Sequence, residues 1–180
     1  MQPYFPGEDT FLLADIVDRY PAKNSLEIGV GRGLITTYLA KMSEYVVGVD
    51  LSVDAIEETS RVLAKLQLLQ KVDLLIADAA TSLTPESFDL VVFNPPYLPS
   101  EETTDRNVDG GRGGISVPIR WFTNSLVVIK KAGRVLMVLS TASKLEEAIA
   151  FFSRQCSVRI VARRRLFFEE LVAIEITRHG

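Results

Sequence analysis

Four places in this sequence carry residues that could bind and activate a polar ligand. They are the glycine-rich loop 27–33, the acids Asp50 and Asp78, and the segment Asn94–Tyr97. Each comes directly after a short apolar run that is typical of a strand. Because the carboxyl ends of parallel strands meet at one edge of a sheet, we expect the four places to line a single site.

The loop EIGVGRG begins at Glu27 and places Gly29, Gly31 and Gly33 at a predicted strand-to-helix turn. Glycine permits a sharp turn and lets a ligand approach the backbone closely. A dinucleotide-binding loop requires its third glycine one position after Gly33, where this chain has a leucine. Glu27 adds a negative charge that would repel a pyrophosphate, so the loop favours a cationic ligand without phosphates.

Asp50 and Asp78 end the second and third predicted strands. A carboxylate at Asp50 can accept hydrogen bonds from both hydroxyls of a ribose, and one at Asp78, next to Ala79, can accept the amino group of an adenine. A ligand with a ribose, an adenine and a positive charge but no phosphate is S-adenosylmethionine. Each signal alone is also typical of a turn or a helix cap, but their combination predicts this methyl donor as the cofactor.

The segment Asn94-Pro95-Pro96-Tyr97 is the predicted reaction centre. Two prolines fix the backbone and remove two N–H donors. The Asn94 side-chain oxygen and the Pro95 carbonyl then form two rigid acceptors for one planar –NH2 group, and Tyr97 offers a flat face for stacking. Two acceptors would pyramidalise the nitrogen, stabilise its developing positive charge and direct its lone pair at a sulfonium methyl. The alternative is a rigid turn after an edge strand.

Alternating hydrophobic periodicities predict the elements that position these residues. Strands are expected over 25–29, 45–49, 72–76, 88–93, 134–139, 158–162 and 171–176, and helices over 9–17, 33–42, 52–67, 115–131 and 143–153. This alternation indicates an α/β three-layer fold with a mostly parallel sheet. The last two strands are too close in sequence for a helix between them, so one antiparallel strand is expected near the C-terminus. The expected inward residues of helix 52–67 are Ile56, Val62, Leu63 and Leu66.

The composition excludes several kinds of site. Among 180 residues Cys156 is the only cysteine and His179 the only histidine, which excludes a disulfide framework, a metal site rich in these residues and a buried histidine base. We expect no metal. No apolar run is long enough to span a membrane and the N-terminus lacks the layout of a signal peptide, so we expect a cytoplasmic protein. The length predicts one domain over 1–180, in which segment 1–23 covers the methyl-donor site.

Taken together, the motifs resemble those of the class I S-adenosylmethionine-dependent methyltransferases that modify planar nitrogen, which have a Rossmann-like fold. The NPPY segment is similar to that of the glutamine-amide, adenine-N6 and cytosine-N4 enzymes. Residues 4–13, YFPGEDTFLL, resemble the N-terminal motif of the HemK-type glutamine methyltransferases of the short eukaryotic and archaeal branch. The loop DGGRGG at 109–114 also matches, whereas Gly7, Arg32 and Val108 differ from the residues usual in that family.

The resemblance implies a substrate and a partner. The substrate is the glutamine of the Gly-Gly-Gln motif in the class I translation termination factor, with its amide held by the NPPY segment. The partner is a small zinc-binding activator protein, for which the expected edge strand Val72 to Ile76 is a candidate docking edge. The resemblance assigns the methyl donor to Thr10, Glu27, Gly29, Asp50, Asp78 and Asn94.

The residues leave two other functions open. An adenine-N6 or cytosine-N4 methyltransferase acting on RNA or DNA would use the same segment, Asn94–Tyr97, as its reaction centre. Residues 111–180 carry 12 Lys and Arg against 5 Asp and Glu, which is typical of a nucleic-acid partner or of sequence halves that interleave in one fold. A non-catalytic S-adenosylmethionine-binding or scaffold subunit is the third reading.

A few other residues carry structural expectations. The aromatic pairs at 151–152 and 167–168 are expected in the core, and Trp121 is expected to pack within its helix. The run Arg163–Arg165 is expected at a solvated hairpin tip.

Overall fold

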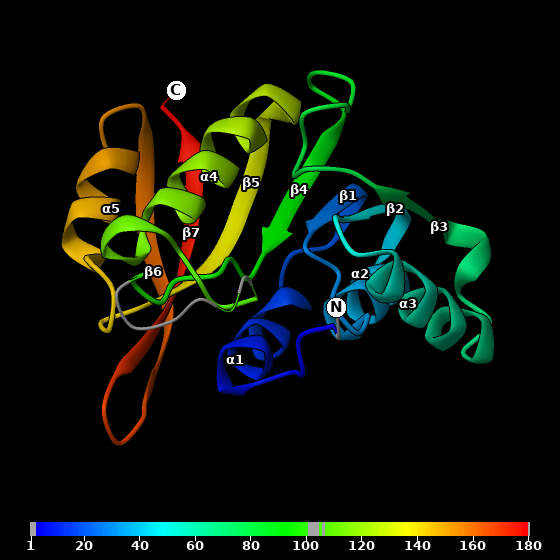
Figure 1. Ribbon diagram of the computed structural model, residues 1–180. Helices are drawn as coiled ribbons and strands as arrows, with labels where there is room; N and C mark the ends of the chain where they lie inside the picture. Colours follow the sequence, from blue (N-terminus) through cyan, green and yellow to red (C-terminus); the bar gives the residue numbers. More distant parts are fainter. Residues whose placement is uncertain (1–2, 101–104, 106, 180) are drawn as a thin grey trace.

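A sheet of seven strands in the order β3-β2-β1-β4-β5-β7-β6 runs through the molecule (Figure 1). The computed structural model describes residues 3–100, 105 and 107–179. The strands are β1 Ala22–Ile28, β2 Ser43–Asp50, β3 Val72–Ile76, β4 Phe88–Phe93, β5 Ile129–Ser140, β6 Cys156–Arg165 and β7 Glu170–Arg178. The helices are α1 Glu8–Val17, α2 Leu34–Met42, α3 Val53–Lys65, α4 Ser116–Val128 and α5 Leu145–Phe152, with short 3₁₀ turns η1 Leu69–Lys71 and η2 Arg112–Gly114.

The strand directions confirm the predicted mostly parallel sheet with an antiparallel strand near the C-terminus. Strands β1 to β5 pair in parallel, and β7 runs antiparallel to both of its neighbours, β5 and β6. The chain leaves β1 towards β2 on one side and returns to β4 on the other. Such a reversal of strand order opens a crevice at the carboxyl ends of the strands, where ligands bind in folds of this kind.

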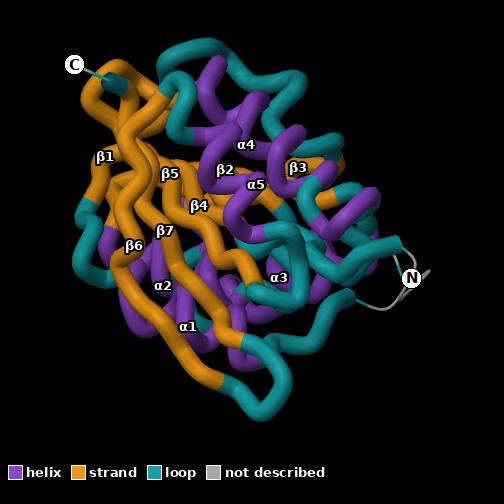
Figure 2. The backbone as a smooth tube through the Cα atoms, turned by 90° about the vertical axis from the view of Figure 1, so that its left-hand side faces the viewer, coloured by secondary structure: helices purple, strands orange, loops and turns teal. Residues whose placement is uncertain are grey.

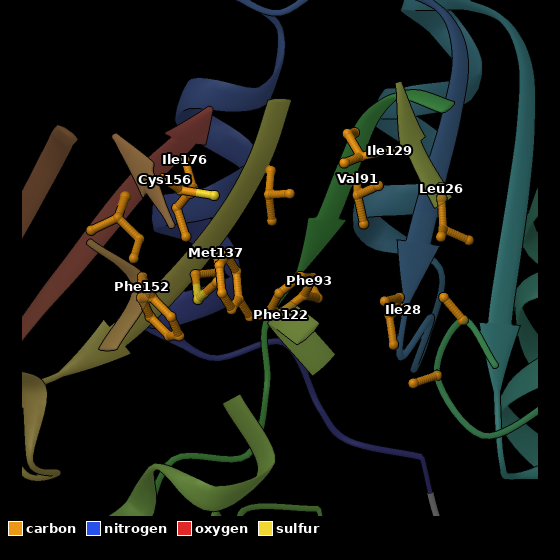
Figure 3. Packing of buried hydrophobic residues seen from close by; sticks show 14 of the residues in the cluster. Leu26, Ile28, Val91, Phe93, Phe122, Ile129, Met137, Phe152, Cys156 and Ile176 are labelled. Carbon is orange, nitrogen blue, oxygen red and sulfur yellow. The ribbon is translucent and has the colours of Figure 1, made fainter. Parts of the chain in front are cut away.

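Helices cover both faces of the sheet (Figure 2). Side chains alternate along β4, so that Val91 and Phe93 enter one buried cluster while Leu90 and Val92 enter the other. The first cluster lies under α4 and α5 and includes fully buried Phe152, as predicted (Figure 3). The second lies under α1 and α2. Among the described residues, no helix has the length and apolarity needed to cross a membrane.

The predicted helix over 115–131 ends too late. Helix α4 stops at Val128, and Ile129 already pairs with Phe88 of β4. The ammonium group of Lys130 lies 2.7 Å from the carboxylate of Asp89 on β4, which holds this part of the chain extended. Lysine favours helices, but sheet pairing outweighs a propensity of a few tenths of a kcal/mol.

Three further expectations about side chains and turns are wrong. The run Arg163–Arg165 belongs to β6 and pairs with β7, so the hairpin turn comprises residues 166–169 instead. Phe167 and Phe168 lie in this turn and are 91% and 93% exposed, not buried. Leu63 of α3 is buried as predicted, but Leu66, just after the last residue of that helix, is half exposed.

Candidate active site

The carboxyl ends of β1, β2 and β4 and the first turn of α1 surround a cavity of about 620 Å³. The structure brings together in its wall all four places singled out in the sequence. The predicted residues that line it are Thr10, Glu27, Gly29, Gly31, Asp50, Asp78, Ala79, Asn94, Pro95, Pro96 and Tyr97. Gly33 is the exception among the predicted residues, since it does not line the cavity.

Gly33 has a different task from the other glycines of its loop. It precedes α2 in the left-handed region, with φ of 78°, where side chains are disfavoured. A Cβ atom there would lie 2.9 Å from the side chain of Thr59 on α3. Gly33 therefore lets the loop turn into α2 against α3, while Gly31 faces the cavity.

The carboxylate of Asp50 is fixed by two backbone amides. Its Oδ2 accepts a hydrogen bond from the N–H of Gly31 at 3.1 Å, and its Oδ1 accepts one from the N–H of Ser52 at 2.9 Å. Each carboxylate oxygen has a second lone pair, so both can still accept from a ligand. Two neighbouring ribose hydroxyls match this arrangement.

Glu27 places a buried carboxyl beneath the glycine loop, with 4% of the residue exposed. Burial raises the pKa of this carboxyl well above its usual range; a hydrogen bond from the Thr36 hydroxyl opposes the shift, and the charge of Asp50 adds to it. A cationic group bound beside Glu27 would favour its ionised form. The geometry therefore suits a positively charged ligand.

Three buried polar atoms of the cavity wall have no partner, and two of them belong to Asp78 and Trp121. Asp78 binds Arg120 through Oδ2 at 2.7 Å, but its Oδ1 is buried and unpaired. The indole N–H of Trp121 is also buried and unpaired. Trp121 packs edge-on against Phe93, as the prediction of a packing role requires, yet it also lines the cavity. Buried polar atoms in folded proteins nearly always have partners, so these atoms indicate a ligand.

The side chain of Asn94 is held in one orientation. Its Nδ2 donates to Thr10 Oγ1 at 3.2 Å, and Thr10 Oγ1 lies 3.2 Å from Asp9 Oδ1. The Thr10 hydroxyl therefore donates a hydrogen bond to the Asp9 carboxyl group and accepts one from Asn94. The Asn94 Oδ1 atom is thereby turned to the opposite side, where it is buried and has no partner.

Asp9 is the residue that sequence reasoning missed, having been treated only as a possible helix start. It is 4% exposed, and besides the Thr10 backbone N–H at 2.6 Å it accepts from the hydroxyls of Tyr97 at 3.0 Å and Tyr4 at 3.1 Å. Burial, followed by the charge of Asp9, raises the pKa of both tyrosines, so both stay protonated donors. Asp9 thus joins the N-terminal segment to the Asn94–Tyr97 corner.

The loop DGGRGG at 109–114 packs against the backbone at the end of the Asn94–Tyr97 corner. The N–H of Gly110 donates to the carbonyl of Leu98 at 2.7 Å. A Cβ atom on Gly110 would lie 2.7 Å from the Cα of Tyr97, and one on Gly114 would collide with the Tyr97 carbonyl. The glycines are needed because two stretches of backbone lie in direct contact there.

The residues present fit S-adenosylmethionine. The cavity has a fixed carboxylate for a ribose, an unpaired buried carboxylate oxygen for an amino group and a buried acid for a cationic group. A second unpaired acceptor, Asn94 Oδ1, belongs to the same wall.

Comparisons with known proteins agree with this chemistry. The model of the methyltransferase small domain family matches residues 8–168. A relative from Methanocaldococcus jannaschii, named "Putative protein N5-glutamine methyltransferase", is 33% identical over 97% of this chain and 91% of its own length. Human methyltransferase HEMK2 is 30% identical over 81% of this chain and 75% of its own length.

A solved structure is similar over the whole chain. It is Mtq2 of E. cuniculi in its complex with Trm112, described as responsible for methylation of the eRF1 translation termination factor. The TM-score is 0.81 at 31% identity, and the match covers 99% of this chain and 100% of that one. The chain therefore belongs to the S-adenosylmethionine-dependent class I methyltransferases with a methyltransferase small domain, and among them to the HemK-type protein glutamine methyltransferases of the eukaryotic and archaeal branch.

Proposed function

We propose that this protein methylates the side-chain amide of the glutamine in the Gly-Gly-Gln motif of a class I translation termination factor. The observation that carries the proposal is the orientation of Asn94, whose unpaired, buried Oδ1 atom belongs to a proline-framed corner of the cavity. The similarity to the E. cuniculi protein in its eRF1-methylating complex supports the choice of substrate.

The cavity residues divide among the parts of S-adenosylmethionine. Asp50 accepts the ribose hydroxyls, Asp78 Oδ1 accepts the adenine amino group beside Ala79, and Glu27 faces the cationic end. Gly29 and Gly31 bring the backbone close to the ligand. The N-terminal segment contributes Tyr4 and Thr10 to the cavity wall, which supports its predicted role in covering the site. When bound, the cofactor would supply the methyl group from its sulfonium, whose carbon–sulfur bond would break to leave a neutral thioether.

The Asn94 corner then prepares the nitrogen. Asn94 Oδ1 and the Pro95 carbonyl accept the two N–H bonds of the glutamine amide, and the ring of Tyr97 holds the amide plane. The two oxygens draw the nitrogen out of conjugation and stabilise its positive charge as the carbon–nitrogen bond forms. The methylated nitrogen then loses a proton to water. No histidine base is required, consistent with a chain whose single histidine is His179.

We also infer that a small zinc-binding activator docks along β3. This strand is at the edge of the sheet, so its outer backbone groups can pair with another strand. Leu75 and Ile76 on β3 are 42% and 59% exposed. Leu51, just after the end of β2, and Val53, the first residue of α3, are 66% and 51% exposed and also line the cavity. Such a row of apolar side chains beside an open edge is typical of a protein interface. The Mtq2 structure contains a comparable small partner, Trm112.

The test is a methylation assay with labelled S-adenosylmethionine, the activator and the termination factor. The expected result is one added methyl group on the Gly-Gly-Gln peptide by mass spectrometry. Label in tRNA or DNA instead would favour the adenine or cytosine alternative. The assay includes nucleic acids because a tRNA (adenine-N6)-methyltransferase of Glaesserella parasuis is 28% identical over 73% of this chain and 57% of its own length.

The same methylation assay addresses the third reading. A scaffold subunit without catalytic function would show no methyl transfer to any of these substrates, whether or not it binds S-adenosylmethionine.

A cytoplasmic location follows from the proposed substrate, which acts on cytoplasmic ribosomes.

A further inference from the structure

Two adjacent phenylalanines form the tip of the β6–β7 hairpin in full contact with solvent. Phe167 and Phe168 are 91% and 93% exposed, the highest values among the large apolar residues that the structure describes. Their rings contact each other edge to face, with centroids 4.7 Å apart. Tight turns usually carry glycine, proline, asparagine or aspartate. Exposed aromatic residues in such a turn break this rule without any gain to the fold, which indicates a functional reason.

The hairpin tip is held in a fixed position. The N–H of Leu166 donates to the carbonyl of Glu169 at 2.8 Å, which closes the turn. Arg164 reaches across to α1 and binds Glu8 at 2.7 Å and Asp15 at 2.6 Å. Because the base of the turn is tied to α1, the two phenylalanines lose little freedom on binding a partner.

The tip lies next to the mouth of the active-site cavity. Glu169, the residue after Phe168, lines the cavity together with Tyr97. Figure 1 shows the β6–β7 hairpin projecting past the sheet on the side where α1 lies. Phe11 on α1 is 45% exposed and shares a helix face with Glu8 and Asp15, which Arg164 binds.

We propose that Phe167 and Phe168, together with Phe11, dock a polypeptide surface of the protein substrate outside its glutamine-bearing loop. This rests on the proposed function. Glu169, which follows Phe168 in the hairpin turn, lines the cavity that contains Asn94, so a macromolecule that delivers an amide there comes close to the hairpin tip. Aromatic side chains on a rigid support are the usual anchors of protein interfaces.

The surrounding charge favours a protein over a nucleic acid. Arg163 and Arg164 lie beside the tip, and both are paired, with Glu170 and with Glu8 and Asp15 respectively. With the exposed Arg165 included, three guanidinium groups beside the tip face the carboxylates of Glu8, Asp15, Glu169 and Glu170, so the surface offers no excess positive charge to a phosphate backbone. The docked segment is accordingly expected to present apolar side chains flanked by basic ones.

The test compares two substrates and two variants. The double variant Phe167→Ser/Phe168→Ser and the control Val127→Ser are assayed with the activator, on the full-length termination factor and on a short Gly-Gly-Gln peptide. Val127 is 56% exposed on α4 and does not line the cavity. For the double variant we expect kcat/KM on the full-length factor to fall about tenfold through KM. Its rate on the peptide, and both rates of the control, should match the parent.

The outcomes separate this proposal from the proposed function. An unchanged KM on the full-length factor, or an equal loss on both substrates, would overturn the docking surface while leaving glutamine methylation in place. A parent protein that methylates neither substrate contradicts the proposed function itself. If the parent labels RNA and the double variant loses that activity, the phenylalanines stack on bases and the protein-docking proposal is wrong. Both substitutions replace exposed side chains, so the melting temperature should stay at the parent value.

Discussion

The side-chain amide of Asn94 donates its N–H to the hydroxyl of Thr10 over 3.2 Å, and this contact decides which end of the amide faces the cavity. Thr10 can accept from Asn94 because its own proton points to the carboxylate of Asp9. A helix that begins at residue 8 thus orients a side chain that follows β4, more than eighty residues later in the chain.

Replacing Asn94 by alanine should slow methyl transfer without preventing cofactor binding. The variant Asn94→Ala loses one of the two oxygens that stabilise the positive nitrogen, a loss of about 10²-fold in kcat for one group of this kind. Single-turnover rates and calorimetry with S-adenosylmethionine provide the measurement. Equal rates for variant and parent would remove Asn94 from the mechanism.

The Thr10 hydroxyl can be tested with a matched pair of variants. Thr10→Val keeps the shape but removes the acceptor of the Asn94 N–H, so the amide can rotate and kcat should fall about tenfold, the effect of one lost hydrogen bond near a reacting group. Thr10→Ser keeps the hydroxyl and should stay within about twofold of the parent. If valine instead raises the Kd of S-adenosylmethionine in proportion and leaves kcat unchanged, the hydroxyl binds the cofactor and does not orient Asn94.

The buried acid Glu27 should make the stability of the free protein depend on pH. Its pKa is raised on folding, so its stabilising contribution is fully present below the ordinary value of 4.5 and is lost as the pH rises through the raised value. At neutral pH Glu27→Gln should therefore have a higher melting temperature than the parent, by about 3 °C for each kcal/mol of unfolding free energy that it regains. At pH 4 the two proteins should melt alike.

The same substitution should weaken the binding of S-adenosylmethionine, because the neutral amide no longer attracts a cationic group. Thermal melts from pH 4 to pH 8, together with calorimetry, measure both effects. The exposed Glu57→Gln is the matched control. A Glu27→Gln variant that melts lower at neutral pH would show that the ionised carboxyl stabilises the free protein, contrary to this account.

If the activator docks along β3, a charged substitution on this strand should weaken its binding. Leu75→Glu places a charge among exposed apolar residues of the edge strand and should weaken the heterodimer at least about tenfold. Gel filtration with the activator and a Kd by calorimetry are the readouts, with Val127→Glu on α4 as the control. Binding of the activator at parent affinity would place its docking site elsewhere. Leu75 does not line the cavity, so cofactor binding should not change.

Local sequence determined the elements and the residues that end them. Strand and helix periods depend on the near neighbours of each residue, which is why β1 to β4 were predicted. The same logic placed Asp50 and Asn94 at strand ends, and parallel strands end at one edge of a sheet. Where long-range pairing competes with local propensity, as at Ile129, the prediction was wrong.

Tertiary structure decided the contacts that no local pattern encodes. The helical period around Asp9 does not reveal that its carboxylate holds Tyr97, because the partner comes from a distant strand end. Nor does composition show that Phe167 and Phe168 face solvent, since their hydrophobicity alone favours the core. The first fact depends on how α1 packs against the residues that follow β4, and the second on the position of the two phenylalanines in the turn between β6 and β7.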